Sequence, residues 1–139
     1  MKKGVLIVIV AVALFSGLVW LNKSDSSGSN QAAKVASKPA LTFTSVQKAV
    51  QNGAKFYDVR TPDEYKTGHF AAATNWSLQE MQANELPDVP KDTQLYVYCR
   101  SGNRSGQATA ILEKAGFTKV TDLHGLSDVE KIGGKLITE

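Results

Sequence analysis

The sequence is poor in the residues that build disulfides and metal sites. Its 139 residues contain one cysteine and two histidines. A single cysteine cannot form an internal disulfide, and these three residues do not have the clustered spacing of a zinc site. No glycine-rich loop of the nucleotide-binding type is present either. We therefore expect no metal and no cofactor, which leaves the one cysteine as the residue to explain.

Most of the chain also lacks an excess of basic residues. The net charge is +3, but residues 1–40 hold five lysines and one aspartate, whereas residues 41–139 hold 11 basic and 12 acidic residues. A nucleic-acid-binding domain usually carries a clear basic excess on one face. The charge balance of residues 41–139 therefore argues against a nucleic-acid partner.

Long hydrophobic runs are absent except at the N-terminus. Residues 4–21 follow Lys2 and Lys3 and contain no charged side chain. As a helix, these 18 residues would be about 27 Å long, just enough to cross a bilayer. The run is either an uncleaved anchor or a cleaved secretory signal. The bulky residues at 19–21 stand where a cleavage site needs small residues, which favours the anchor.

The sequence predicts three segments. Residues 1–21 form the anchor or signal, and residues 22–40 form a flexible linker with five serines and no apolar periodicity. Residues 41–139 form one globular domain. Because Lys2 and Lys3 favour a cytoplasmic N-terminus, we expect this domain at the cell membrane and outside the cytoplasm. Cleavage would make it secreted or periplasmic.

Residues 41–139 alternate strand-like and helix-like patterns, which predicts an α/β fold with a mainly parallel sheet. Residues 94–99 are apolar on both faces, as is typical of a central parallel strand. Residues 104–115 place apolar side chains at helical spacing. The expected strands are 41–43, 55–59, 71–75, 94–99 and 118–123, and helices are expected to begin near residues 45, 62, 78, 104 and 126.

The only cysteine, Cys99, stands between the clearest strand and the clearest helix. Binding sites of open α/β sheets lie outside the carboxyl ends of the strands. The amides that begin a helix have no helical partner, and together with the helix dipole they favour negative charge. Cys99 should therefore have a lowered pKa and react as a thiolate. Gly102 allows the backbone to curl around the sulfur. The alternative is a buried core cysteine without chemistry.

Two groups of residues resemble the motifs of one family, the rhodanese (thiosulfate sulfurtransferase) homology domain in its single-domain form. The first group is Asp58-Val59-Arg60, Glu64-Tyr65, Gly68-His69-Phe70 and Ala73-Thr74-Asn75, and the second is Tyr98-Cys99-Arg100-Ser101-Gly102-Asn103-Arg104-Ser105. The second resembles the active-site loop of the family. The resemblance implies a three-layer rhodanese-like fold, with a central, mainly parallel sheet of about five strands and helices on both faces.

The chain departs from the family pattern at three places. The family usually has glycine where Ala72 stands, and one glycine of a Gly-Gly pair is replaced by His124. A tryptophan found in many members is replaced by Val129 or Glu130. None of these changes lies within the cysteine loop.

The resemblance implies a sulfurtransferase. Cys99 would take a sulfane sulfur from thiosulfate or a similar anion, carry it as a persulfide, and pass it to a thiol or cyanide. The residues expected to bind the substrate are Arg100, Ser101, Gly102, Asn103, Arg104 and Ser105. Those expected to support the site are Asp58, Arg60 and Glu64. A structural ion pair with Asp58 or Glu64 is an equally open role for Arg104. His69 is expected to be structural, and His124 a surface residue.

Other functions remain open at this stage. Cys99 could serve a persulfide carrier that does not turn over, or a redox-sensing module. A phosphatase or arsenate reductase is less favoured, because related phosphatases of this fold have five residues between cysteine and arginine. This chain has four between Cys99 and Arg104, and a shorter loop makes a narrower nest of amides.

Overall fold

The computed structural model describes residues 40–138. The predicted anchor or signal, residues 1–21, and the predicted linker up to residue 39 lie outside the described residues. Within residues 40–138, no helix combines the length and the apolar character needed to cross a membrane.

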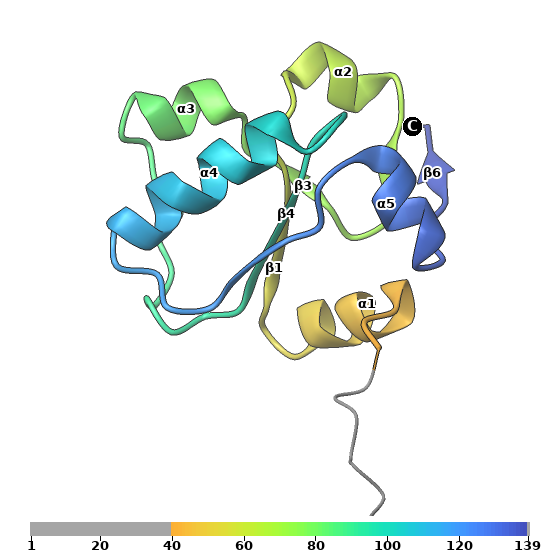
Figure 1. Ribbon diagram of the computed structural model, residues 1–139, viewed down its shortest axis with the longest axis horizontal. Coiled ribbons are helices and arrows are strands. Elements are labelled where there is room, and N and C mark those ends of the chain that lie inside the picture. Colours follow the sequence, from red (N-terminus) through yellow and green to blue (C-terminus); the bar gives the residue numbers. More distant parts are fainter. Residues whose placement is uncertain (1–39, 139) are drawn as a thin grey trace, which may run out of the picture. The chain divides into compact units, whose positions relative to one another are not determined.

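A four-stranded parallel sheet forms the centre of the domain (Figure 1). Its strands are β1 (Lys55–Asp58), β3 (Thr74–Asn75), β4 (Leu95–Tyr98) and β5 (Val120–Asp122), in the order β3-β1-β4-β5. A separate antiparallel pair joins β2 (His69–Phe70) to β6 (Leu136–Ile137). The central sheet thus has four strands rather than about five.

The missing strand is the one predicted at residues 41–43, and that prediction is wrong. Thr42 is instead the N-cap of α1 (Phe43–Gln51), and Phe43 is the first residue of that helix. The Thr42 hydroxyl accepts the Ser45 amide at 3.2 Å, while the Thr42 amide donates to the Ser45 hydroxyl at 3.1 Å. This reciprocal capping box satisfies amides at the helix start and fixes the beginning of the helix two residues earlier than expected.

Four more helices surround the sheet. They are α2 (Pro62–Lys66), α3 (Leu78–Gln82), α4 (Asn103–Lys114) and α5 (Leu126–Lys131). Thr61 caps α2 and Ser77 caps α3, each through a capping box with a glutamate three residues later. Both helix starts match the sequence prediction.

The two faces of β4 belong to two different cores, which gives the domain three layers. Leu95 and Val97 pack in a cluster with side chains of α3 and α4, whereas Tyr96 and Tyr98 pack with side chains of α1 and α5. Figure 1 shows α3 and α4 on one side of the sheet and α1 and α5 on the other. The predicted central strand, covered on both sides, is confirmed.

The parallel direction of the central strands brings their carboxyl ends to one edge of the sheet. At this edge β4 is followed by Cys99, β1 by the segment Val59–Thr61, and β5 by the turn that leads into α5. Such an edge is where α/β proteins bind ligands.

Candidate active site

Cys99 follows β4 directly, and a hydrogen bond of its backbone amide holds it in place. Its amide donates to the carbonyl of His124 at 2.9 Å. Its side chain is folded inward, with the residue only 1% exposed. The Gly102 amide donates to Sγ at 3.1 Å, and the Ser105 Oγ lies 3.6 Å from Sγ. Gly102 has φ +94, a conformation that glycine adopts readily. That conformation turns the loop back over the sulfur.

The first turn of α4 faces this sulfur. Gly102 is the N-cap of α4 and offers no side chain to its free amides. Ser105 is fully buried, and its hydroxyl lies 3.0 Å from the Gly102 carbonyl and 3.2 Å from the His124 carbonyl. The sulfur can therefore accept hydrogen bonds from the amides to which a capping side chain would otherwise bind.

The pKa of the Cys99 thiol is the result of two opposing effects. Burial raises the pKa, because it disfavours the charged thiolate. Hydrogen bonds from the amides of Ser105, Ser101 and Gly102, together with the Ser105 hydroxyl, lower it by more. The net pKa lies below that of an ordinary thiol. The predicted thiolate character of Cys99 has its cause in this nest of donors.

The other loop residues lie at the surface. Arg100, Ser101 and Asn103 are exposed, and the side-chain Oδ1 atom of Asn103 accepts from the side-chain Nε2 atom of Gln107 at 2.8 Å. The Arg100 side chain forms no ion pair and no hydrogen bond with any of residues 40–138. Its guanidinium is thus available to an anion that approaches the loop.

Arg104, in contrast, is held by Glu64 of α2. Its Nη1 and Nη2 atoms bind the two carboxylate oxygens at 2.6 and 2.8 Å. The arginine hydrogen bond lowers the pKa of Glu64 to about 2, more than burial raises it. Thr61 also donates to this carboxylate. Of the two open roles for Arg104, the geometry favours the structural ion pair, which ties α4 to α2.

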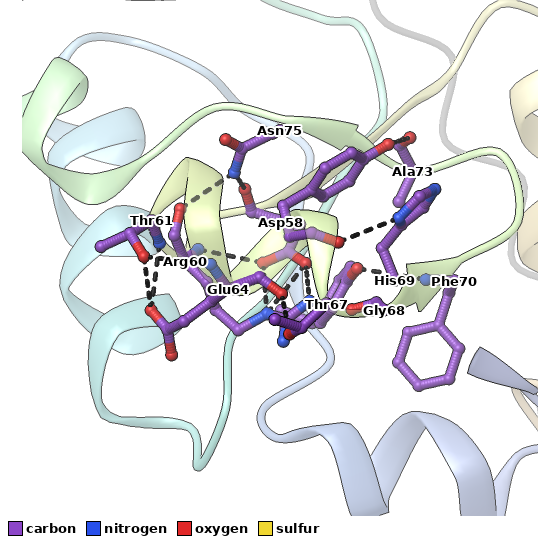
Figure 2. Close-up of polar contacts among 12 residues, drawn as sticks. Asp58, Arg60, Thr61, Glu64, Thr67, Gly68, His69, Phe70, Ala73 and Asn75 are labelled. Carbon is purple, nitrogen blue, oxygen red and sulfur yellow. Dashed lines mark hydrogen bonds and ion pairs between the residues drawn. The ribbon is translucent and has the colours of Figure 1, made fainter. Parts of the chain in front are cut away.

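Asp58 and Arg60 form a second, deeper pair, which Figure 2 shows with its neighbours. Both residues are buried, and the Arg60 Nε atom binds the Asp58 carboxylate at 2.9 Å. Arg60 also donates to the Gly68 carbonyl at 2.6 Å. The Asn75 amide group donates to the carbonyls of Asp58 and Arg60 at 2.9 Å. The pair thus braces the end of β1 against β3 and the turn before β2.

His69 lies in this same region and not at the sulfur. It is buried, stacks on Tyr65 with 3.8 Å between ring centroids, and has Nδ1 3.1 Å from the Tyr65 carbonyl. These contacts agree with the structural role expected for it.

The sequence analysis missed the role of the turn between β5 and α5, because it treated His124 only as a surface residue. The side chain is 66% exposed, but its Nδ1 lies 3.3 Å from the Asp122 carboxylate. Its carbonyl binds Cys99 and Ser105, as described above. A signal was available, because Asp122 ends β5 and His124 comes two residues later, at the same edge of the sheet as the end of β4. Among residues 40–138, no three His, Cys, Asp or Glu side chains are grouped as a metal site requires.

Comparisons with known proteins agree with this arrangement. The family model described as Rhodanese-like domain matches residues 42–126. Thiosulfate sulfurtransferase PspE of Escherichia coli (strain K12) is 40% identical over 73 residues, which cover 52% of this chain and 70% of PspE. The uncharacterized protein YqhL of Bacillus subtilis (strain 168) is 35% identical over 83 residues, covering 60% of this chain and 64% of YqhL. A solved structure described as rhodanese with anions from E. coli is 34% identical with a TM-score of 0.52, and the match covers 62% of this chain and 99% of that one.

Proposed function

Because this chain belongs to the rhodanese-like domain family, we propose that it is a sulfurtransferase that uses Cys99 as its sulfur carrier. The donor is thiosulfate or a similar sulfane-sulfur anion, and the acceptor is a thiol or cyanide. The observation that carries this proposal is the nest of backbone amides and the Ser105 hydroxyl around the Cys99 sulfur. The similarity to a thiosulfate sulfurtransferase supports the choice of donor.

In the first half-reaction, the Cys99 thiolate attacks the outer sulfur of thiosulfate. The sulfur–sulfur bond of the donor breaks, and its electron pair leaves with sulfite. Cys99 is left as a persulfide whose outer sulfur carries the negative charge. The amides of the loop are arranged to stabilise that charge, in the way that an oxyanion hole stabilises a developing oxyanion.

The donor must first be held at the mouth of the loop. Arg100 is exposed and has no ionic partner among residues 40–138, and its forked donors suit an oxyanion. Ser101 and Asn103 contribute their backbone amides, since their side chains lie at the surface. Arg104 assists indirectly, because its pair with Glu64 holds the first turn of α4 in position.

The alternatives receive less support. Redox-sensing cysteines are usually solvent-accessible, whereas Cys99 is 1% exposed. A phosphatase needs its loop arginine for the phosphate, but both terminal nitrogens of Arg104 are engaged by Glu64. A persulfide carrier that does not turn over shares the same geometry, and only kinetics separates it from an enzyme.

The test uses the full chain in mild detergent, with Cys99→Ala as the control. After incubation with thiosulfate and removal of the excess, intact-protein mass should show one added sulfur on the wild type and none on the variant. Cyanide should remove the sulfur as thiocyanate. Repeated thiocyanate release would identify an enzyme, and a single release a carrier. A folded, reduced wild type that gains no sulfur would contradict the use of thiosulfate.

We also propose that the N-terminal segment attaches the domain to the cell membrane, on the side away from the cytoplasm. The support for this is the sequence of residues 1–21, with its uncharged run of 18 residues after two lysines.

A further inference from the structure

One ionisable side chain beside the cysteine loop has no role in the scheme above. His124 lies in the turn between β5 and α5, and its carbonyl binds the Cys99 amide at 2.9 Å. Its Cβ lies 3.5 Å from the point that a Cβ on Gly102 would occupy. Gly102 in turn donates its amide to the Cys99 sulfur. His124 is therefore part of the wall of the sulfur site, although its side chain reaches solvent.

The backbone of His124 is held in an unusual conformation. Its φ of +62 lies in the left-handed region, which residues other than glycine adopt rarely. The Asp122 Oδ1 atom accepts the His124 amide at 2.8 Å and so stabilises the turn. Strained residues of this kind gather at functional sites, where the surrounding structure maintains them.

Asp122 also determines which imidazole nitrogen is available. Its Oδ2 atom lies 3.3 Å from Nδ1 of His124. Because a carboxylate only accepts hydrogen bonds, Nδ1 must carry a proton, and the neutral ring then has its lone pair on Nε2. Nε2 makes no hydrogen bond within residues 40–138, and the side chain is 66% exposed. An Asp–His pair oriented in this way is the usual arrangement of a general base.

Building on the proposed sulfurtransferase function, we propose that Nε2 of His124 is the base that deprotonates a thiol acceptor in the second half-reaction. The persulfide first takes a proton from water to become Cys99–S–SH. As the acceptor R–SH loses its proton to Nε2, its sulfur forms a bond with the outer sulfur. The bond between the two persulfide sulfurs breaks, and its electron pair returns to Cys99 as the thiolate. The product is R–S–SH, and no oxidant or reductant is consumed.

This role identifies the class of acceptor. An alkyl thiol has a pKa of about 8.5 and is mostly protonated at neutral pH, so its attack is accelerated by a nearby base. An acceptor that is already an anion, such as an ionised aryl thiol, has no proton to lose. A site with the Asp122–His124 pair as its base therefore favours alkyl thiols as sulfur acceptors.

The experiment isolates the second half-reaction. The full chain in mild detergent is loaded with sulfur from inorganic tetrasulfide, so that a failure with thiosulfate cannot affect the result. Discharge of the persulfide is then timed at neutral pH with cysteine and with thionitrobenzoate, an aryl thiolate. The variants are His124→Asn and His124→Gly, because these residues adopt positive φ most readily and preserve the turn.

We expect both variants to discharge to cysteine about tenfold more slowly or worse, and to thionitrobenzoate at the wild-type rate. Free imidazole in the buffer should partly restore the cysteine reaction of His124→Gly. Equal losses with both acceptors would mean that His124 only maintains the loop, and an unchanged cysteine rate would mean that it is not a base. Either result overturns this inference, while thiosulfate loading of the wild type separately tests the proposed function.

Discussion

At the scale of single residues, the lowered pKa of the Cys99 thiol depends on a few hydrogen bonds that outweigh its burial. The Ser105 hydroxyl supplies one of them through its side chain, whereas Ser101 acts through its backbone amide. A substitution by alanine removes the hydroxyl and keeps the backbone amide. It should therefore change the pKa of Cys99 at position 105 but not at position 101.

We predict that Ser105→Ala raises the pKa of Cys99. With less thiolate present, alkylation by iodoacetamide should be several-fold slower than in the wild type at neutral pH, and the difference should disappear at high pH. Ser101→Ala is the matched control and should leave the alkylation profile unchanged. Identical profiles for wild type and Ser105→Ala would show that the backbone amides alone set the pKa.

Ala72 offers a second test at this scale. It has φ +68, in the turn between β2 and β3. The left-handed conformation costs an L-residue about 1 kcal/mol or more, whereas glycine adopts it freely. We predict that Ala72→Gly stabilises the protein by up to about 1 kcal/mol, after the greater freedom of glycine in the unfolded chain is included.

The measurement for Ala72→Gly is the midpoint of denaturant unfolding. Ala110→Gly, at an exposed position within α4, is the control and should lower stability by about 1 kcal/mol. If both glycine variants lose stability alike, the backbone at Ala72 is not strained.

The candidate site residues could be located in the sequence because they stand in motifs. The motifs identified the cysteine loop and the supporting Asp58 and Arg60, but they contain no information on backbone angles. Ala72 and His124 were noticed only as departures from glycine. The structure gives the physical reason, since both have positive φ. The Asp122–His124 pair could not be found from His124 alone.

At the scale of elements, the ion pair between Glu64 and Arg104 fastens α2 to the first turn of α4. The folded pKa of Glu64 is about 2, below its ordinary value of 4.5. A carboxyl group whose pKa is lower in the folded than in the unfolded protein stabilises the folded state at every pH above its unfolded pKa. This stabilisation is lost as the pH falls through the folded pKa. The loss should therefore occur between about pH 5 and pH 2.

We predict that Glu64→Gln lowers the free energy of unfolding by about 1–2 kcal/mol at neutral pH. This figure is reduced from the full pKa shift, because the Glu64 side chain is 31% exposed and partly screened by solvent. The difference from wild type should shrink as pH falls toward 2 in denaturant titrations. Asp63→Asn, which breaks an exposed pair with Lys66, should change stability little at any pH. A constant difference across this pH range would exclude the ion pair as its source.

Elements were predictable where the chain carries a capping box or a long apolar pattern. The starts of α2 and α3 follow from Thr61 and Ser77 with their partner glutamates. The strand predicted at residues 41–43 was wrong because three residues cannot distinguish strand from helix. The two-residue strands β2 and β6 were missed for a related reason, since their pairing depends on tertiary contact rather than on periodicity.

At the scale of the whole molecule, the doubly apolar strand β4 predicted the layered architecture, because a strand that is apolar on both faces must be covered on both. The number of strands in the central sheet was less predictable, since the fifth expected strand rested on residues 41–43 alone, and these lead into α1.

We predict that the full chain sediments with membranes and is released by detergent but not by high salt. A chain that begins at residue 22 should remain in the supernatant. The reason is the uncharged run within residues 1–21. Fractionation followed by intact-mass measurement distinguishes the possibilities. A soluble product that lacks its first residues would identify a cleaved signal and contradict the anchor.

The burial of Cys99 has a consequence for the order of events at the surface. The empty thiol is 1% exposed, but a persulfide adds a second sulfur about 2 Å farther from the backbone. In the proposed cycle, an acceptor thiol would therefore reach the outer sulfur of the loaded protein more easily than the buried sulfur of the empty one. The sulfur donor, in contrast, would have to bring its own outer sulfur down to Cys99. The depth of this one side chain would thus treat donor and acceptor differently.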